Sequence, residues 1–245
     1  MKEVEYPRGE RVYKIREGKL PEALMDGEVH VWKIELGDLL SCSRDLDEFL
    51  DSSELKRKSR FSAKEHANRF ALMRTHLKTI LSKYIDAKAE DLQFELSKYG
   101  RPFLNTGNLN FSFSLSHSRS KALLAVSLDG VCGIDLEFKE LLDESDAQLF
   151  RSFDKDATSK IENGEWRENF YQSWTLKEAT AKALGLGMRL DFKKINADRS
   201  SVPHQVIVEE RSVNPKNLWA IPLKVFEGYE ACFVTDNKAT SIKIL

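Results

Sequence analysis

Two carboxylates separated by one residue, Asp135 and Glu137, are the first candidates for chemistry in this chain. They lie in the segment VCGIDLEF, residues 131–138, where polar and apolar residues alternate as they do in a half-buried strand. In such a strand both carboxylates share a face with Gly133. Paired carboxylates suit a hard divalent cation such as Mg2+, and a glycine lets a ligand approach the backbone. A solvated acidic face explains the same alternation, so this segment alone leaves both interpretations open.

A second set of charged residues follows in the segment WRENFYQSWTLKEATAKAL. The residues that recur there in steps of four are Trp166, Phe170, Trp174, Glu178 and Lys182. Four residues turn a helix by about 400°, so these side chains lie near one face. A surface Glu–Lys pair worth roughly 0.2–0.5 kcal/mol is the plain alternative. The aromatic stripe favours an inward orientation, with Glu178 and Lys182 facing a cleft.

Two further groups of polar residues are candidates for binding an anion. Ser116 and His117 lie in the segment SHSRS, which we expect to turn the chain between two strands. The basic side chains of residues 56–60 precede a long amphipathic segment. Such a cluster is usually a solvated face, but it is also able to hold a phosphate.

The elements that position these residues are predicted by periodicity. We expect a strand over 28–36 and then a helical region over 41–85, with a capping box at Ser62 and Glu65. A turn at 99–102 and an antiparallel meander over 111–138 should follow. The rest of the chain should contain a helix over 166–184, ended by Gly185, and strands from 195 to 245. This order predicts an α+β protein. We divide it into an N-terminal extension (1–27) and two α+β subdomains (28–129 and 130–245).

Composition restricts the class of protein. Lys and Arg total 38 against 39 Asp and Glu in 245 residues, so no global field recruits nucleic acid or a membrane. The three cysteines are far apart and form no pairing or metal-binding pattern, which indicates a reducing compartment. The longest apolar run, ALLAV, is too short to span a bilayer. We therefore expect a cytoplasmic protein.

Taken together, the motifs RFSAKEHANRF, YGRP, SLSHS, GIDLE and WTLKEATAKALGLGM resemble the signature of 4'-phosphopantetheinyl transferases of the surfactin-synthetase (Sfp) type. The resemblance covers about residues 29–233. It implies a monomeric pseudodimer of two similar α+β halves, each a long helix packed on an antiparallel sheet, with coenzyme A in the cleft between them. A weak repeat between the halves agrees with this fold. The implied reaction transfers 4'-phosphopantetheine from coenzyme A to a serine of an apo acyl or peptidyl carrier protein and releases 3',5'-ADP.

The resemblance also implies roles for individual residues. The metal ligands, for Mg2+ or Mn2+, would be Asp135, Glu137 and Glu178, and the catalytic residues Asp135, Glu178 and Lys182. The residues expected to hold coenzyme A are Arg57, Arg69, Arg101, Ser116, His117 and Lys182. Either Glu178 or water on the metal would be the base. The chain departs from the family pattern at Arg101, where Lys is common, at Ser114, where Asn is usual, and at Ala179, where Ser is common.

Two other function classes use the same residues. A non-catalytic scaffold would bind an acidic or phosphorylated partner through residues 56–60 and would need no Asp135. A metal-dependent phosphohydrolase would use the same carboxylates and would release phosphate from coenzyme A without a carrier protein.

Overall fold

The computed structural model describes residues 3–8, 11–17, 24, 27–36, 46–85, 87–106, 111–128, 130–210, 217–236 and 241–245. The strands in these ranges are β1 (Glu3–Arg8), β2 (Arg11–Glu17), β3 (Glu28–Glu35), β4 (Glu95–Leu96), β5 (Pro102–Phe103), β6 (Ser112–Ser118), β7 (Lys121–Ser127), β8 (Cys132–Phe138), β9 (Ile195–Asp198), β10 (His204–Val208), β11 (Leu218–Leu223), β12 (Tyr229–Thr235) and β13 (Ser241–Ile244). The α-helices are α1 (Ser52–Lys58), α2 (Lys64–Leu81), α3 (Glu144–Phe153), α4 (Ala157–Glu162) and α5 (Trp166–Leu184).

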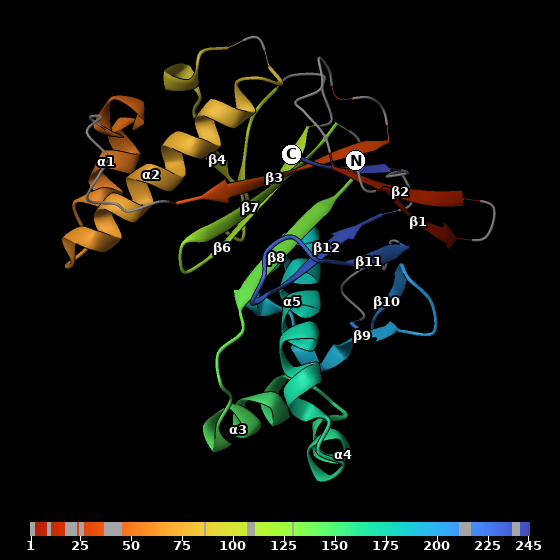
Figure 1. Ribbon diagram of the computed structural model, residues 1–245. Coiled ribbons are helices and arrows are strands. Elements are labelled where there is room, and N and C mark those ends of the chain that lie inside the picture. Colours follow the sequence, from red (N-terminus) through yellow and green to blue (C-terminus); the bar gives the residue numbers. More distant parts are fainter. Residues whose placement is uncertain are drawn as a thin grey trace.

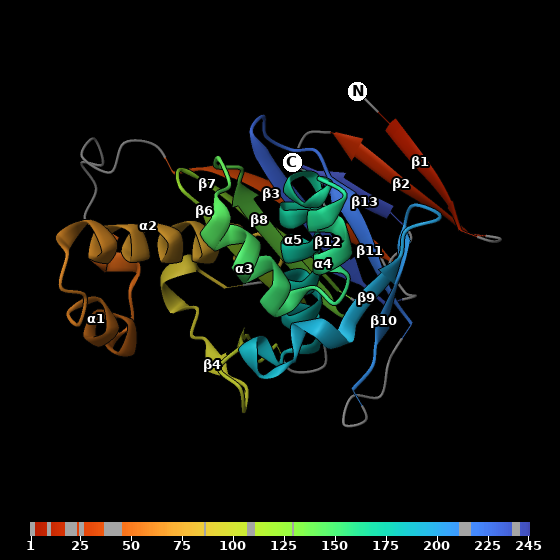
Figure 2. The same ribbon diagram turned by 90° about the horizontal axis from the view of Figure 1, so that it is seen from below.

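The strands form two large sheets and one small one. The first has the order β1-β2-β13-β3-β7-β6, the second has the order β8-β12-β11-β10-β9, and β4 pairs with β5. Strand β13 lies parallel to both β2 and β3, so the last described strand returns to the first sheet (Figure 2). The subdomain boundaries expected at 27/28 and 129/130 stay a prediction.

The two sheets pack face to face, and each carries one long helix on its other face (Figure 1). Val31 and Leu123 of the first sheet and Phe233 of the second are buried in the core between the sheets. Helix α2 covers the first sheet through residues such as Leu77, and α5 covers the second through residues such as Ala179. The α+β class is therefore confirmed, whereas a duplicated origin for the two halves stays a prediction.

Helix α5 and strand β8, which carry the candidate chemistry, form as their periodicities predict. Helix α5 ends where Gly185 adopts φ +68°, a left-handed conformation that glycine adopts without a steric penalty. Cys132, Ile134 and Leu136 of β8 are fully buried in the core between the sheets. The alternate residues of β8, among them Asp135, therefore face α5.

The region expected to be one helical stretch over residues 41–85 is broken, so this prediction was wrong in detail. Residues 41–45 lie outside the described residues, and a 3-10 turn, Leu46–Phe49, precedes the separate helices α1 and α2. The capping box predicted at Ser62 is also wrong, because the N-cap of α2 is Ala63 and makes no side-chain hydrogen bond. A capping box is instead found at α1, where Asp51 pairs with Glu54.

The meander predicted over 111–138 is correct for β6 and β7 but wrong for β8. Strand β8 pairs with β12, not with β7, so the two sheets separate at this point of the chain. Gly130 has φ +94° where the chain leaves the first sheet. The predicted turn is also shorter than expected. Ser116 and His117 belong to β6, and the turn itself is Arg119–Ser120, with Arg119 at φ +50°.

Candidate active site

The seam between the two sheets is bridged by serine side chains of β6. Alternate residues of this strand, Ser114, Ser116 and Ser118, turn their hydroxyl groups toward β8. Each hydroxyl oxygen accepts a hydrogen bond from a β8 amide: Ile134 N to Ser114 Oγ at 3.0 Å, Leu136 N to Ser116 Oγ at 3.3 Å and Phe138 N to Ser118 Oγ at 3.0 Å. These hydroxyls supply the acceptors that a paired strand would otherwise provide along this edge of β8.

Asp135 is the buried centre of the site. The residue is 3% exposed, and Oδ1 accepts hydrogen bonds from Ser116 Oγ at 2.8 Å and from Lys182 Nζ at 2.7 Å. Lys182 also donates to Ser116 Oγ at 3.0 Å and to the carbonyl oxygen of Ile134 at 3.1 Å. The other carboxylate oxygen, Oδ2, is buried and has no hydrogen-bond partner among the described residues. Such an oxygen is able to accept a hydrogen bond from water or to bind a cation.

Glu137 and Glu178 share the electrostatic environment of Asp135. Burial raises the pKa of Glu137, and the charge of Asp135 raises it further, while Ser118 Oγ donates a hydrogen bond to its Oε2 at 3.0 Å. Burial likewise raises the pKa of Glu178, as do Asp135 and Glu137, and Lys182 opposes this effect. The three carboxylates therefore interact, although Glu178 is remote from the other two in sequence.

Gly133 brings α5 this close to β8. A Cβ atom at this position would lie 1.9 Å from the carbonyl oxygen of Ala179 and 2.5 Å from the amide nitrogen of Ala183. The expectation that a ligand approaches the backbone at Gly133 is therefore wrong, because the helix backbone occupies that space. Strand residue Asp135 and helix residue Lys182 meet because no side chain separates the two elements here.

The oxygen ligands of this cluster fit a divalent cation in their chemistry. Carboxylates are the ligands that Mg2+ and Mn2+ prefer, and no described residue bonds to the buried Oδ2 of Asp135. The nearby carboxylates raise the pKa of Glu137 and of Glu178, in addition to burial, so a positive charge at the cluster would be favourable. In the part of the chain that the structure describes, however, no three such side chains are arranged as a ready-made set of metal ligands.

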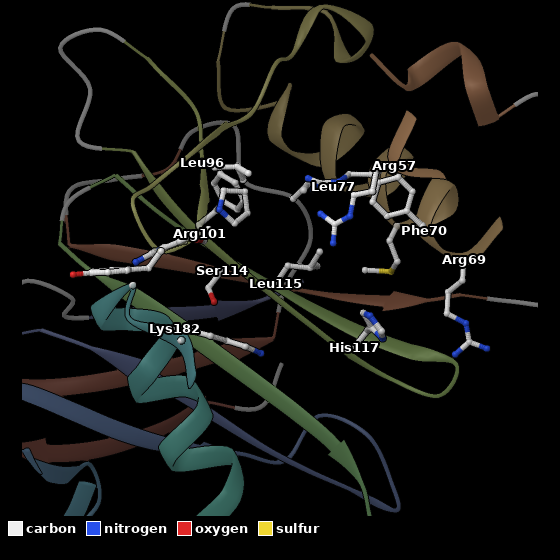
Figure 3. Close-up of a pocket in the computed structure, with 18 of the residues that line it drawn as sticks. Arg57, Arg69, Phe70, Leu77, Leu96, Arg101, Ser114, Leu115, His117 and Lys182 are labelled. Carbon is white, nitrogen blue, oxygen red and sulfur yellow. Dashed lines mark hydrogen bonds between the residues drawn. The ribbon is translucent and has the colours of Figure 1, made fainter. Parts of the chain in front are cut away.

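A cavity of about 670 Å³ is lined by Lys182, the lysine bonded to Asp135 (Figure 3). It lies between α2, the turn before β5, strand β6 and the end of α5. Its polar lining includes Arg57, Arg69, Arg101, His117 and Lys182, and its apolar lining includes Phe70, Met73, Leu77, Leu96 and Tyr99. Ser116 and the three carboxylates do not line this cavity, and Lys182, which projects from α5 toward β6, connects it to Asp135 (Figure 3).

The cations around the cavity are held in different ways. The guanidinium of Arg57 lies over the ring of Phe70, 5.2 Å from its centroid, and the opposite side of the cavity carries Lys182. Arg69 bonds to the Glu65 carboxylate at 3.0 Å and to the carbonyl oxygen of Arg119 at 3.2 Å. Burial lowers the pKa of His117, and the positive charges of Arg69 and Lys182 lower it further. His117 is therefore neutral at pH 7.

Arg101 differs from these residues because its guanidinium donates to main-chain carbonyls of three different elements. Nη1 donates to the carbonyl oxygen of Ala183 at 3.1 Å, and Nη2 donates to those of Phe113 at 3.2 Å and Cys132 at 3.1 Å. The predicted site residues thus divide into a carboxylate cluster, which Ser116 and Lys182 join, and a cavity wall that carries Arg57, Arg69, Arg101, His117 and Lys182.

Sequence reasoning missed the contributions of Ser118 and Phe70. Ser118 bonds to Glu137, and the signal that indicates it is the alternation of serines in SFSLSHS, which places three hydroxyls on one face of β6. Phe70 lies on α2, and its ring supports the guanidinium of Arg57. Neither contact is visible without the packing of one element on another.

Comparison with known proteins decides the family. A model of the 4'-phosphopantetheinyl transferase superfamily matches residues 131–234, which contain β8 and α5. The 4'-phosphopantetheinyl transferase HetI of Nostoc sp. is 33% identical over 170 residues, which cover 67% of this chain and 72% of HetI. This chain belongs to the 4'-phosphopantetheinyl transferase superfamily.

Other transferases match across both sheets. The 4'-phosphopantetheinyl transferase gsp of Aneurinibacillus migulanus is 27% identical over 206 residues, covering 80% of this chain and 82% of gsp. The L-aminoadipate-semialdehyde dehydrogenase-phosphopantetheinyl transferase of Xenopus laevis is 24% identical over 188 residues, covering 71% of this chain and 61% of that protein. The resemblance inferred from the motifs is confirmed, and the chain is a transferase enzyme. None of the helices in the described part of this transferase has the length and apolar character to cross a bilayer.

Proposed function

We propose that this transferase moves the 4'-phosphopantetheine group from coenzyme A to a serine hydroxyl of an apo acyl or peptidyl carrier protein. The contact of Lys182 with Asp135 carries the proposal, because it joins a cavity with a cationic wall to a cluster of three carboxylates. A pyrophosphate donor needs positive charge along its length, and phosphoryl transfer depends mainly on positioning and charge neutralisation. The cavity and the cluster supply both.

The phosphates of coenzyme A would be held by cavity residues whose N–H groups are able to turn toward a phosphate oxygen: Arg57, Arg69, His117 and Lys182. The apolar lining around Leu77 and Leu96 would contact the uncharged parts of the donor. Arg69 is bonded to Glu65 and to a carbonyl oxygen, so it would exchange these partners for phosphate oxygens. Ser116 is bonded to Asp135 and does not line the cavity, so it would act through that carboxylate.

In the reaction, the serine oxygen of the carrier attacks the β-phosphorus of coenzyme A. A bond forms between these two atoms, the bond from the phosphorus to the bridging oxygen breaks, and 3',5'-ADP leaves with that oxygen. Lys182 offsets the negative charge that grows on the leaving group. The serine proton passes to Glu178 or to a water molecule beside the carboxylate cluster.

Asp135, Glu137 and Glu178 would hold a Mg2+ or Mn2+ ion, with the unpartnered Oδ2 of Asp135 as the most evident ligand atom. When bound, such an ion supplies positive charge against pyrophosphate oxygens. Without it, the buried carboxylates repel the donor as well as one another. The location in the cytoplasm, the monomeric state and the lack of nucleic-acid or membrane partners remain predictions from the sequence.

The test is the intact mass of a carrier protein. Apo acyl and peptidyl carriers would be incubated with coenzyme A, Mg2+ and either the wild-type transferase or Asp135→Asn. We expect the carrier to gain one phosphopantetheine with the wild type and a rate at least about 100-fold lower with the variant. No gain on any carrier of a broad panel would contradict the proposal. Breakdown of coenzyme A without a carrier would instead support a phosphohydrolase.

A further inference from the structure

Arg101 joins three elements of the seam through a single side chain. Its guanidinium donates to the carbonyl oxygen of Phe113 at the start of β6, to that of Cys132 at the start of β8 and to that of Ala183 in the last turn of α5. These elements belong to both sheets and to the helix that covers the second sheet. In the described part of the structure, β6 and β8 are not paired through their backbones, so this side chain replaces missing backbone contacts.

The backbone of Arg101 is itself fixed by a tight turn. Gly100, at φ +83°, lies in this turn, and the amide of Arg101 donates to Ser97 Oγ at 3.1 Å while its carbonyl accepts from Ser97 N at 2.8 Å. The guanidinium therefore extends from a rigid base. The planar fork of arginine reaches carbonyl groups in three different positions, whereas the ammonium of lysine is a single point of donation.

Each of the three carbonyls is close in sequence to a residue of the proposed site. Phe113 precedes Ser116 on β6, Cys132 precedes Asp135 on β8, and Ala183 directly follows Lys182 on α5. The hydrogen bonds that unite Ser116, Asp135 and Lys182 require these elements to keep their register. A positive charge at the end of α5 is also favourable, because the helix dipole leaves its last carbonyls partly negative.

We propose that Arg101 is a positioning residue that holds β6, β8 and α5 in register for catalysis, and that it is not a ligand of a coenzyme A phosphate. The proposal rests on the proposed function and reassigns one of the residues expected to hold the donor. Arg101 also lines the cavity, so a phosphate ligand is the competing role. The two roles differ in whether substitution changes the turnover number or the affinity for the donor.

The test compares Arg101→Met and Arg101→Lys with the control Arg199→Met. Arg199 is exposed and also makes three hydrogen bonds to α5, to Asn169 Oδ1, Gln172 Oε1 and Ser173 Oγ, but none to β6 or β8. We expect both Arg101 variants to lower kcat at least tenfold and to change the KM for coenzyme A less than twofold, with Arg199→Met close to the wild type. A tenfold rise in KM at unchanged kcat for Arg101→Met, with Arg101→Lys fully active, would overturn the proposal.

Hydrogen exchange gives a second measurement that does not depend on activity. In Arg101→Lys we expect faster exchange in residues 112–118, 132–136 and 181–186 than in the wild type, whereas Arg199→Met leaves these segments unchanged. Unchanged exchange in all three segments would contradict the positioning role. If the wild type transfers nothing to any carrier, the proposed function fails, but this exchange pattern still decides whether Arg101 holds the three elements together.

Discussion

The ammonium nitrogen of Lys182 lies 2.7 Å from Oδ1 of Asp135, although the two residues are 47 positions apart in the sequence. The contact joins the end of α5 to the middle of β8, and Ser116 of β6 completes it by bonding to both side chains. Asp135 is almost fully buried, so its charge depends on these partners for compensation.

The ion pair between Lys182 and Asp135 predicts that substitutions of these two residues have non-additive effects on the free energy of unfolding. Lys182→Met leaves the buried carboxylate of Asp135 without its cation and should lower the free energy of unfolding by about 1–3 kcal/mol. In Asp135→Asn/Lys182→Met the uncompensated charge is absent, so the double variant should be more stable than the sum of the single losses, by roughly 1 kcal/mol or more. Denaturant unfolding of all four proteins measures this difference. Additive losses would show that the contact contributes nothing.

Gly133→Ala should disrupt the seam, because the new Cβ would lie 1.9 Å from the carbonyl oxygen of Ala179. We expect a loss of about 3 kcal/mol or more, or failure to fold, since neither backbone can move without breaking its own hydrogen bonds. Gly164→Ala is the control. Unlike Gly133, Gly164 has a positive φ, +76°, but a Cβ there meets no atom within 4 Å, so only backbone strain of about 1 kcal/mol is expected. Equal losses in the two variants would refute the packing explanation.

The raised pKa of Glu178 predicts how stability depends on pH. Between the ordinary value of 4.5 and the raised value, the folded state binds more protons than the unfolded state, so the free energy of unfolding falls as pH rises through this window. Without added metal, Glu178→Gln should therefore melt higher than the wild type at pH 7, by about 2–4 °C for each 1 kcal/mol. The difference should close below pH 4.5.

The exposed Glu227→Gln serves as the control and should show no such pH-dependent difference. Melting curves from pH 4 to pH 8 test both variants. A wild type that is more stable than Glu178→Gln at pH 7 in the absence of metal would contradict the raised pKa of Glu178. Added Mg2+ should then raise the melting temperature of the wild type but not that of Asp135→Asn.

His117 predicts a pH dependence of donor binding. Burial, Arg69 and Lys182 lower its pKa from 6.5, so it is neutral in the free protein at pH 7. An anionic ligand nearby would raise that pKa, so binding takes up a proton and becomes tighter as pH falls. Titration of 3',5'-ADP between pH 5.5 and pH 8 should show this effect, up to about tenfold in Kd for each pKa unit. His117→Gln is compared at every pH, because the ligand phosphate also titrates, and identical curves for the two proteins would remove His117 from the site.

The local parts of the site could be predicted from the sequence. The steps of four in α5 and the alternation in β8 depend only on neighbouring residues, so they locate Glu178, Lys182, Asp135 and Glu137 correctly on their elements. Gly185 marks the end of α5 for the same reason. These predictions hold because hydrophobic periodicity and glycine conformation act within a few residues.

The long-range parts of the site could not be predicted from periodicity. The dipeptide Asp129-Gly130 before β8 is typical of a hairpin, so it predicts that β8 pairs with β7. Strand β8 pairs with β12 instead, because its apolar face then packs against the first sheet in the core between the sheets. The role of Arg101 depends on carbonyls from three elements, which no spacing reveals. Family resemblance identified the residue, but only the packing of the elements shows what it contacts.

The most direct test of the proposed transfer from coenzyme A to the carrier measures both products of the reaction. The wild-type transferase would be incubated with coenzyme A, Mg2+ and an apo carrier, and the modified carrier and 3',5'-ADP would be quantified by mass spectrometry over time. The proposed transfer produces equal amounts of the two products, and Asp135→Asn should form neither of them at a comparable rate. Release of 3',5'-ADP without modification of the carrier, or an unimpaired Asp135→Asn, would contradict it.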